Sequence, residues 1–202
     1  MNEPEKSSLP NGFETLKLQK TLVLVGLMGA GKTSVGKRVA AILNVDFVDS
    51  DSEIVEAAGM SIPEIFAGLG EAAFRDGERR VIARLLAGRP CVLATGGGAF
   101  MEARTREEIK AHGTSVWIRA DVQLLWERVR GRPGRPLLDN PNPRQVLADL
   151  ERRRAPIYAE ADVIVESVRG ASHVDMAVRI IDSVRAYDGA ATSGDKTIGE
   201  KR

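Results

Sequence analysis

The chain lacks the features that mark secreted and membrane-spanning proteins. Its 202 residues include a single cysteine, Cys91, so no disulfide bond can form within the chain. Cys91 stands in an apolar run, which indicates a buried thiol. The sequence shows no signal peptide and no apolar stretch long enough to cross a bilayer. We therefore expect a cytoplasmic protein that makes no contact with a membrane.

The chain also lacks an excess of charge of either sign. It carries 29 Lys and Arg residues against 28 Asp and Glu residues, a formal net charge of +1. Such a balance provides no overall attraction to nucleic acid or to an anionic membrane. Basic residues do gather between 128 and 154, but no aromatic residue lies among them for base stacking. The sequence therefore predicts no nucleic-acid partner.

A glycine-rich loop follows the first apolar strand, Thr21–Val25. Residues Gly26–Thr33, here called the phosphate loop, read GLMGAGKT and match the pattern G-x-x-x-x-G-K-[ST], with a helix predicted directly after them. The glycines let backbone N–H groups surround an anion, and the helix directs its positive end at the same point. Lys32 would add a charge for the β- and γ-phosphates, and Thr33 a hydroxyl for Mg²⁺. The loop therefore predicts a nucleotide-phosphate site.

Strands and helices alternate along the chain. Strands are predicted at 21–25, 45–48, 91–95, 115–119 and 162–166. The first helix is expected to end before Asn44, and further helices are predicted at 52–58, 61–66, 70–87, 102–111, 122–129, 143–154 and 174–186. Ser61–Glu64 is expected to form a capping box, and Asp121 is expected to cap the helix that follows it. This alternation predicts an α/β fold with a five-stranded parallel sheet and helices on both faces.

The length and ordinary composition indicate one domain, at residues 21–186. Residues 1–20 are polar and include Pro4 and Pro10, and residues 187–202 are rich in small and charged residues, so we expect both segments to be disordered. Proline and glycine repeatedly interrupt the segment at about 128–142. We expect this segment to form a mobile lid that brings arginine onto transferring phosphates.

Two further strands end in residues that can carry chemistry. Asp49 and Asp51 close the neighbouring strand segment, and Gly96–Gly98 follow the third strand. In an open parallel sheet, ligands bind beyond the carboxyl ends of the strands. One carboxylate can hold metal-bound water while the other accepts a hydrogen bond from a substrate hydroxyl, although a helix cap would also explain these residues. The glycines would form either an anion nest or a simple turn.

Arg75 and Glu78 lie three residues apart in a predicted helix, so they share one face. An exposed ion pair of this kind would contribute only about 0.2–1 kcal/mol. Gly77 lies between them, although glycine costs about 1 kcal/mol relative to alanine inside a helix. We infer that something packs closely at Gly77 and that Glu78 orients Arg75.

Taken together, these motifs resemble those of the shikimate kinases, which belong to the nucleoside-monophosphate-kinase-like class of P-loop enzymes. The resemblance covers about Leu22–Ala186 and rests on GLMGAGKTS, FVDSD, FRDGE, ATGGGA, RPLL at 135–138 and RRRAPIY at 152–158. It implies a three-layer P-loop kinase fold with a mobile lid. It also implies transfer of the ATP γ-phosphate to the 3-hydroxyl of shikimate, with Mg²⁺, by a monomer.

The resemblance assigns one group of residues to the nucleotide. The ATP phosphates would be wrapped by Gly29, Ala30, Gly31, Lys32, Thr33 and Ser34. Thr33 would bind Mg²⁺, supported through water by Asp49. Arg128 would pack on adenine.

A second group is assigned to the acceptor and the reaction. Arg75, Arg154 and the Gly97 backbone would bind shikimate, the two arginines through its carboxylate. Asp51 would hold the hydroxyl that is phosphorylated and is the candidate base. Lys32, Asp51 and the lid residue Arg135 would be the catalytic residues.

Other proteins with a phosphate loop were weighed against this interpretation. A gluconate kinase or another small-acid kinase of the same class is not expected to combine DSD, FRDGE and GGG. A GTPase-type switch needs a guanine-reading N-K-x-D segment, and the sequence contains none. A nucleotide-binding regulator would leave the paired carboxylates and Arg75 without a role.

Overall fold

The computed structural model describes residues 17–131 and 140–195. Its centre is one sheet formed by β1 (Thr21–Val25), β2 (Phe47–Asp49), β3 (Val92–Ala94), β4 (Gly113–Arg119) and β5 (Val163–Glu166). The spatial order of the five strands is β2-β3-β1-β4-β5, and every neighbouring pair is parallel. The predicted α/β fold with a five-stranded parallel sheet is therefore confirmed.

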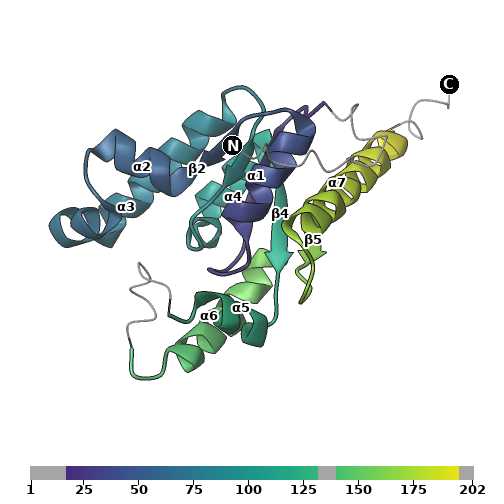
Figure 1. Cartoon of the computed structure of the whole chain (residues 1–202). Helices are drawn as coiled ribbons and strands as arrows, with labels where there is room; N and C mark the ends of the chain where they lie inside the picture. The colour runs from purple at the N-terminus through teal and green to yellow at the C-terminus, as the bar shows by residue number, and fades with distance from the viewer. Residues whose placement is uncertain (1–16, 132–139, 196–202) are drawn as a thin grey trace, which may run out of the picture.

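Helices cover both faces of this sheet (Figure 1). They are α1 (Lys32–Leu43), α2 (Ser50–Ala58), α3 (Ile62–Leu86), the short 3₁₀ helix η1 (Ala99–Met101), α4 (Ala103–His112), α5 (Val122–Val129), α6 (Pro143–Tyr158) and α7 (His173–Asp195). α1 packs beside α7, whereas α3 packs against α4. None of the helices in the described ranges is both long and apolar enough to span a membrane.

Neighbouring residues of β1 identify the two faces. The side chain of Leu24 approaches α1 next to Gly36. The side chain of Val23 points the other way and lies with Leu86 of α3 beside Gly113. Successive side chains of a strand alternate between faces, so α1 and the end of α3 lie on opposite sides of the sheet.

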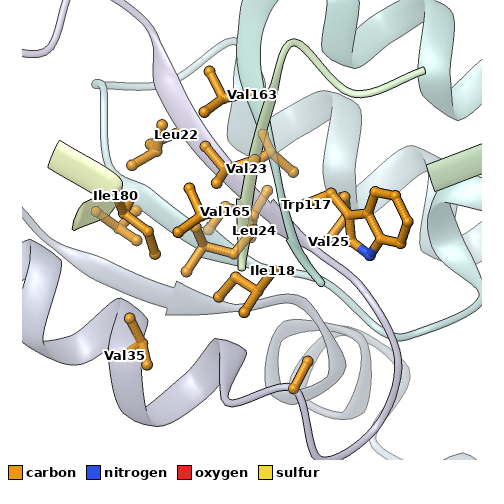
Figure 2. Close-up of a cluster of buried hydrophobic side chains, with 14 of the residues drawn as sticks. Leu22, Val23, Leu24, Val25, Val35, Trp117, Ile118, Val163, Val165 and Ile180 are labelled. Carbon is orange, nitrogen blue, oxygen red and sulfur yellow. The ribbon is translucent and has the colours of Figure 1, made fainter. Parts of the chain in front are cut away.

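The core is centred on β1. Leu22, Val23, Leu24 and Val25 are at most 1% exposed, and Figure 2 shows them among side chains from β4, β5, α1 and α7. A parallel strand covered on both faces reads as a continuous apolar run, which is why the sequence identified it. Each fully buried aliphatic side chain contributes about 1.5–3 kcal/mol. β1 therefore provides a rigid support for the phosphate loop that follows it.

Two helix starts predicted from the sequence are present. Ser61 begins α3 with a capping box, in which its backbone N–H donates to Glu64 Oε2 at 2.8 Å and the Glu64 N–H donates to Ser61 Oγ at 3.4 Å. Asp121 Oδ1 accepts a hydrogen bond from the Leu124 N–H at 2.8 Å and begins α5. The two helices predicted at 61–66 and 70–87 follow one another within α3, and a kink separates them at Gly70, whose φ of +80° is not helical.

Some expectations about the sheet and the helix ends were wrong. β2 does not neighbour β1, because β3 lies between them, and consecutive strands are neighbours only in most cases. α6 continues past the predicted end at 154, and its last turn places Tyr158 in the core. The predicted lid lies largely outside the described residues, and so do the predictions for 1–16 and 196–202.

The prediction of a disordered tail from residue 187 is wrong for residues 187–195, which continue α7. The Tyr187 hydroxyl donates a hydrogen bond to Asp162 Oδ1 at 3.2 Å and ties this part of α7 to the start of β5. Extending an existing helix needs no new nucleus, so one such contact is enough to favour further turns. Sequence composition alone did not reveal that contact.

Two helical glycines provide a matched test of this packing. A Cβ atom on Gly36 would lie 2.7 Å from Phe47 Cε2 and 2.9 Å from Leu24 Cδ1, whereas nothing lies within 4 Å at Gly77. We expect Gly36→Ala to lower the free energy of unfolding by about 1–3 kcal/mol through overpacking. Gly77→Ala should raise it by about 0.5–1 kcal/mol, because alanine is the better helix former. Urea unfolding followed by circular dichroism measures both, and a shift of the same sign in the two variants would contradict this packing.

Candidate active site

A cleft of about 540 Å³ opens at the carboxyl ends of the central strands. It is lined by residues 28–35 of the phosphate loop and α1, by Asp49, Asp51 and residues 95–97, and at its far end by Arg128, Ser167, Ala171, His173 and Met176. The loops after β1, β2 and β3 all contribute, as expected for a ligand site in a parallel sheet. The cleft therefore combines the three strand ends that the sequence singled out.

The phosphate loop has the backbone geometry that its glycines permit. Gly29 and Gly31 have φ values of +82° and +104°, which side-chain-bearing residues rarely adopt. Lys32 begins α1, and its Nζ donates to the carbonyl oxygens of Gly26 at 2.8 Å and Leu27 at 3.1 Å. The ammonium group thus lies across the start of the loop, and the N-terminus of α1 points into the cleft. Both features favour a bound phosphate.

Thr33 and Asp49 lie side by side. The Thr33 hydroxyl donates to Asp49 Oδ2 at 3.1 Å, while Asp49 Oδ1 accepts from the Asp51 N–H at 3.1 Å and caps α2. Within 17–131 and 140–195, no three His, Cys, Asp or Glu side chains gather closely enough to hold a metal ion. Mg²⁺ commonly binds through one or two protein oxygens plus phosphates and water. The pair therefore fits Mg²⁺ bound with a nucleotide, whereas it does not form a complete metal cage.

Asp51 and Glu78 direct carboxylate oxygens at the same point of the backbone. A Cβ atom on Gly96 would lie 2.8 Å from Asp51 Oδ1 and 3.0 Å from Glu78 Oε1. Burial raises the pKa of Asp51, and nearby Asp49 raises it further, against the lowering effect of Lys32 and Arg75. The two carboxylates can approach residue 96 this closely only because glycine has no side chain.

Glu78 holds the guanidinium of Arg75 in place. Its Nη1 donates to Glu78 Oε2 at 2.6 Å, and the Glu78 side chain is only 3% exposed, so this is not the surface ion pair considered as an alternative. Burial raises the pKa of Glu78, and the Arg75 guanidinium only partly offsets that rise. Among the described residues, Glu78 Oε1 is a buried side-chain oxygen without a hydrogen-bond partner. The charge of Glu78 therefore acts mainly on Arg75.

The close packing expected at Gly77 is absent, and that inference was wrong. The close approach occurs instead at Gly98, where a Cβ atom would lie 2.6 Å from Arg75 Nη2 and 2.7 Å from Nη1. The guanidinium of Arg75 thus lies flat against the backbone of the glycine segment. The sequence pointed to Gly77 because contacts within one or two turns of a helix can be predicted from residue spacing. The contact between Arg75 and Gly98 joins distant segments, so spacing could not reveal it.

Arg154 reaches the same segment from α6. Its Nη1 donates to the Gly97 carbonyl oxygen at 2.8 Å, and the Tyr158 hydroxyl donates to the same oxygen at 2.5 Å. Gly97 and Gly98 are adjacent, so the structure brings Arg154 and Arg75 together from separate helices. Sequence reasoning missed Tyr158. Its spacing of four residues from Arg154, one turn along a helix, was the available signal.

Arg128 lies beside the phosphate loop. Its Nη1 donates to the carbonyl oxygens of Gly29 at 3.2 Å and Ala30 at 3.4 Å and to Ser167 Oγ at 3.0 Å. Burial lowers the pKa of Arg128. Ser167 directly follows β5, so the strand-end rule that located the aspartates could also have located it. Arg135 lies outside the described residues.

Known proteins share much of this sequence and this fold. The sequence profile of the shikimate kinase family matches residues 28–185. A shikimate kinase of Paramagnetospirillum magneticum is 57% identical over 171 residues, which cover 85% of this chain and 87% of that protein. A solved shikimate kinase from Acinetobacter baumannii, in complex with shikimate, is 42% identical with a TM-score of 0.79, covering 86% of this chain and 96% of that one.

A gluconokinase from Sinorhizobium meliloti 1021 is also similar, at 17% identity and a TM-score of 0.56, covering 86% of this chain and 97% of that one. Identity at that level shows a shared fold and nothing about the acceptor. The family profile, in contrast, spans most of the chain, including residues 28–33 of the phosphate loop and both arginines that contact the glycine segment. The chain therefore belongs to the shikimate kinase family.

Proposed function

We propose that the chain transfers the γ-phosphate of ATP to the 3-hydroxyl of shikimate, a step of aromatic amino acid biosynthesis, with its substrate held between Asp51 and the pair Arg75 and Arg154. The observation that carries this proposal is the convergence of these side chains on Gly96–Gly98, beside the phosphate loop. A rigid acid with a carboxylate at one end and a hydroxyl at the other matches that distribution of charge. The complex of the Acinetobacter baumannii protein with shikimate supports the same acceptor.

The carboxylate of the acceptor would bind between the two guanidinium groups. Charge-assisted hydrogen bonds from arginine are among the strongest that proteins make, and two forks can hold both oxygens of one carboxylate. Glu78 keeps Arg75 fixed, because the Glu78 side chain is buried and accepts a hydrogen bond from Arg75 at 2.6 Å. A site in which Arg75 is already held in place favours a rigid cyclic acid over flexible gluconate, which would lose more conformational entropy on binding.

The hydroxyl would lie against Asp51. The raised pKa of Asp51 makes its carboxylate a better proton acceptor than an exposed aspartate. Lys32 lies close enough to offset part of that rise. The Lys32 ammonium would leave the loop carbonyls for the β- and γ-phosphates and neutralise charge as the phosphoryl group moves. Positioning and charge neutralisation account for most catalysis in phosphoryl transfer.

Thr33 and Asp49 would hold Mg²⁺, Thr33 directly and Asp49 through water. The metal would neutralise charge on the phosphate oxygens. Arg128 would border the adenine, with Ser167 and His173 on the same end of the cleft. The catalytic role of Arg135 in a lid, the monomeric state and the cytoplasmic location remain predictions from the sequence.

Acceptor choice is the decisive test. Coupled assays of ADP release should show turnover with shikimate and little with gluconate. Arg75→Ala and Arg154→Ala should each raise the shikimate KM by about ten- to a hundredfold, the effect of losing a charged hydrogen bond, and leave the ATP KM nearly unchanged. Arg152→Ala is a matched control, because its side chain is 73% exposed and pairs with Asp149. Equal turnover with gluconate would contradict the proposal.

Asp51→Asn separates catalysis from stability. We expect kcat to fall by about 10²–10⁴-fold, as for loss of a general base, with little change in the ATP KM. Because the pKa of Asp51 is raised in the folded protein, the Asp51 charge lowers the free energy of unfolding at pH values above that pKa. This loss of stability disappears as the pH falls toward 3.8, the ordinary pKa of an aspartate. Asp51→Asn should therefore melt higher than the wild type at pH 7, and the gain should shrink on acidification. A variant that melts lower at pH 7 would contradict the burial of this charge.

The glycine segment can be tested without touching a charged residue. Gly98 has a φ of −99°, which alanine adopts readily, but its Cβ would displace the Arg75 guanidinium. Gly98→Ala should raise the shikimate KM several-fold while the ATP KM stays constant. Gly77→Ala, on the same helix as Arg75 and in open space, should leave both constants unchanged. Unchanged shikimate kinetics in Gly98→Ala would show that Arg75 does not act from the position described.

A further inference from the structure

We infer that Tyr158 is a positioning residue: its buried hydroxyl holds the Gly97 carbonyl, which frees Arg154 to turn from that carbonyl to the substrate's carboxylate. The inference rests on the proposed function, because it concerns how the acid-binding pair is prepared. It assigns a role to a residue that does not itself touch the acceptor. The contact that carries it is the double hydrogen bond on one oxygen, from Tyr158 at 2.5 Å and from Arg154 at 2.8 Å.

Gly97 lies between the phosphate loop and α6. A Cβ atom on Gly97 would lie 3.5 Å from the Gly26 carbonyl oxygen, 3.6 Å from Arg154 Nη1 and 3.8 Å from the Tyr158 hydroxyl. Gly26 is also the residue whose carbonyl accepts from Lys32. The glycine therefore separates the nucleotide side of the cleft from the acid side by one layer of backbone. A shift of Gly97 would therefore displace groups on both sides of the cleft.

The ring of Tyr158 cannot move easily. The residue is 1% exposed, and its ring stacks on Trp117 of β4 with centroids 5.7 Å apart and on Phe100 of η1 at 6.3 Å. Burial raises the pKa of the hydroxyl to about 12, so the group remains a donor at neutral pH. Arg154 is only partly buried, and its guanidinium is at the end of a long, flexible side chain. Of the two donors on the Gly97 oxygen, the tyrosine is fixed and the arginine can turn.

This difference matters when the acid arrives. An arginine bonds a carboxylate more strongly than a neutral carbonyl, so Arg154 gains by turning toward the substrate. The Gly97 oxygen is partly buried, so leaving it without any protein donor would cost part of its hydrogen-bond energy. The Tyr158 hydroxyl keeps the Gly97 oxygen paired and so removes that cost. Arginine has five N–H donors, but without the tyrosine hydroxyl one of them would have to stay on the Gly97 oxygen. That bond would restrict how far the guanidinium can turn toward the substrate.

Tyr158→Phe removes this hydroxyl and keeps the stacked ring. We expect the shikimate KM to rise about five- to fifteenfold, the effect of one lost hydrogen bond, with kcat at saturating shikimate within twofold of the wild type and the ATP KM unchanged. Tyr187→Phe is the matched control, because it loses a hydroxyl contact to Asp162 far from the glycine segment and should change neither constant. The same assays on Arg154→Ala and on Arg154→Ala/Tyr158→Phe complete a double-mutant cycle.

The cycle distinguishes positioning from a structural role. If the hydroxyl acts through Arg154, its loss should add less than twofold to the KM of Arg154→Ala. Full additivity, an equal rise in the ATP KM, an unchanged shikimate KM or a Tyr158→Phe chain that no longer folds by circular dichroism would each overturn the inference. Absence of shikimate turnover in the wild type would overturn the proposed function and this inference together, whereas the other outcomes leave the proposed function intact.

Discussion

The glycine segment Gly96–Gly98 is the constraint on which the site depends, because it lets charged side chains from three helices lie directly on backbone. Asp51 and Glu78 meet over Gly96, Arg154 bonds the oxygen of Gly97, and Arg75 lies on Gly98. Any side chain in the first or third of these positions would occupy space that a charged group already fills. The acids and guanidiniums also balance one another there, which is the condition for keeping charge in a partly buried place.

The cost of this arrangement is visible in the carboxylates. Burial raises the pKa of both Asp51 and Glu78, so the charged form of each carboxylate is less stable in the fold than in water. Arg75 offsets part of that cost at Glu78, whose second oxygen has no hydrogen-bond partner among the described residues. Stability given up at functional positions is common in enzymes. Under the proposed function, Asp51 would accept a proton, while Glu78 holds Arg75 in place.

The strand order explains how the parts come together. β2, β3 and β1 are adjacent in space, so their carboxyl ends present the aspartates, the glycine segment and the phosphate loop in that sequence. β1 is buried on both faces and carries the loop, whereas β2 is short and less buried. The phosphate loop is therefore anchored in the core, whereas the proposed acceptor side of the cleft depends more on helices α2, α3 and α6.

Sequence alone determined the features that arise from residues close together in the chain. The phosphate loop, the capping box at Ser61, the cap at Asp121 and the apolar run of β1 are local, because hydrogen bonds and periodicity within a few residues create them. Tertiary structure decided what lies between distant segments. The place of β3, the open space at Gly77 and the bond from Tyr158 to Gly97, 61 residues away, could not be read from local patterns. Such contacts exist only after the sheet has formed, since the packing of the whole core, rather than any short stretch, sets which backbone atoms a side chain can reach.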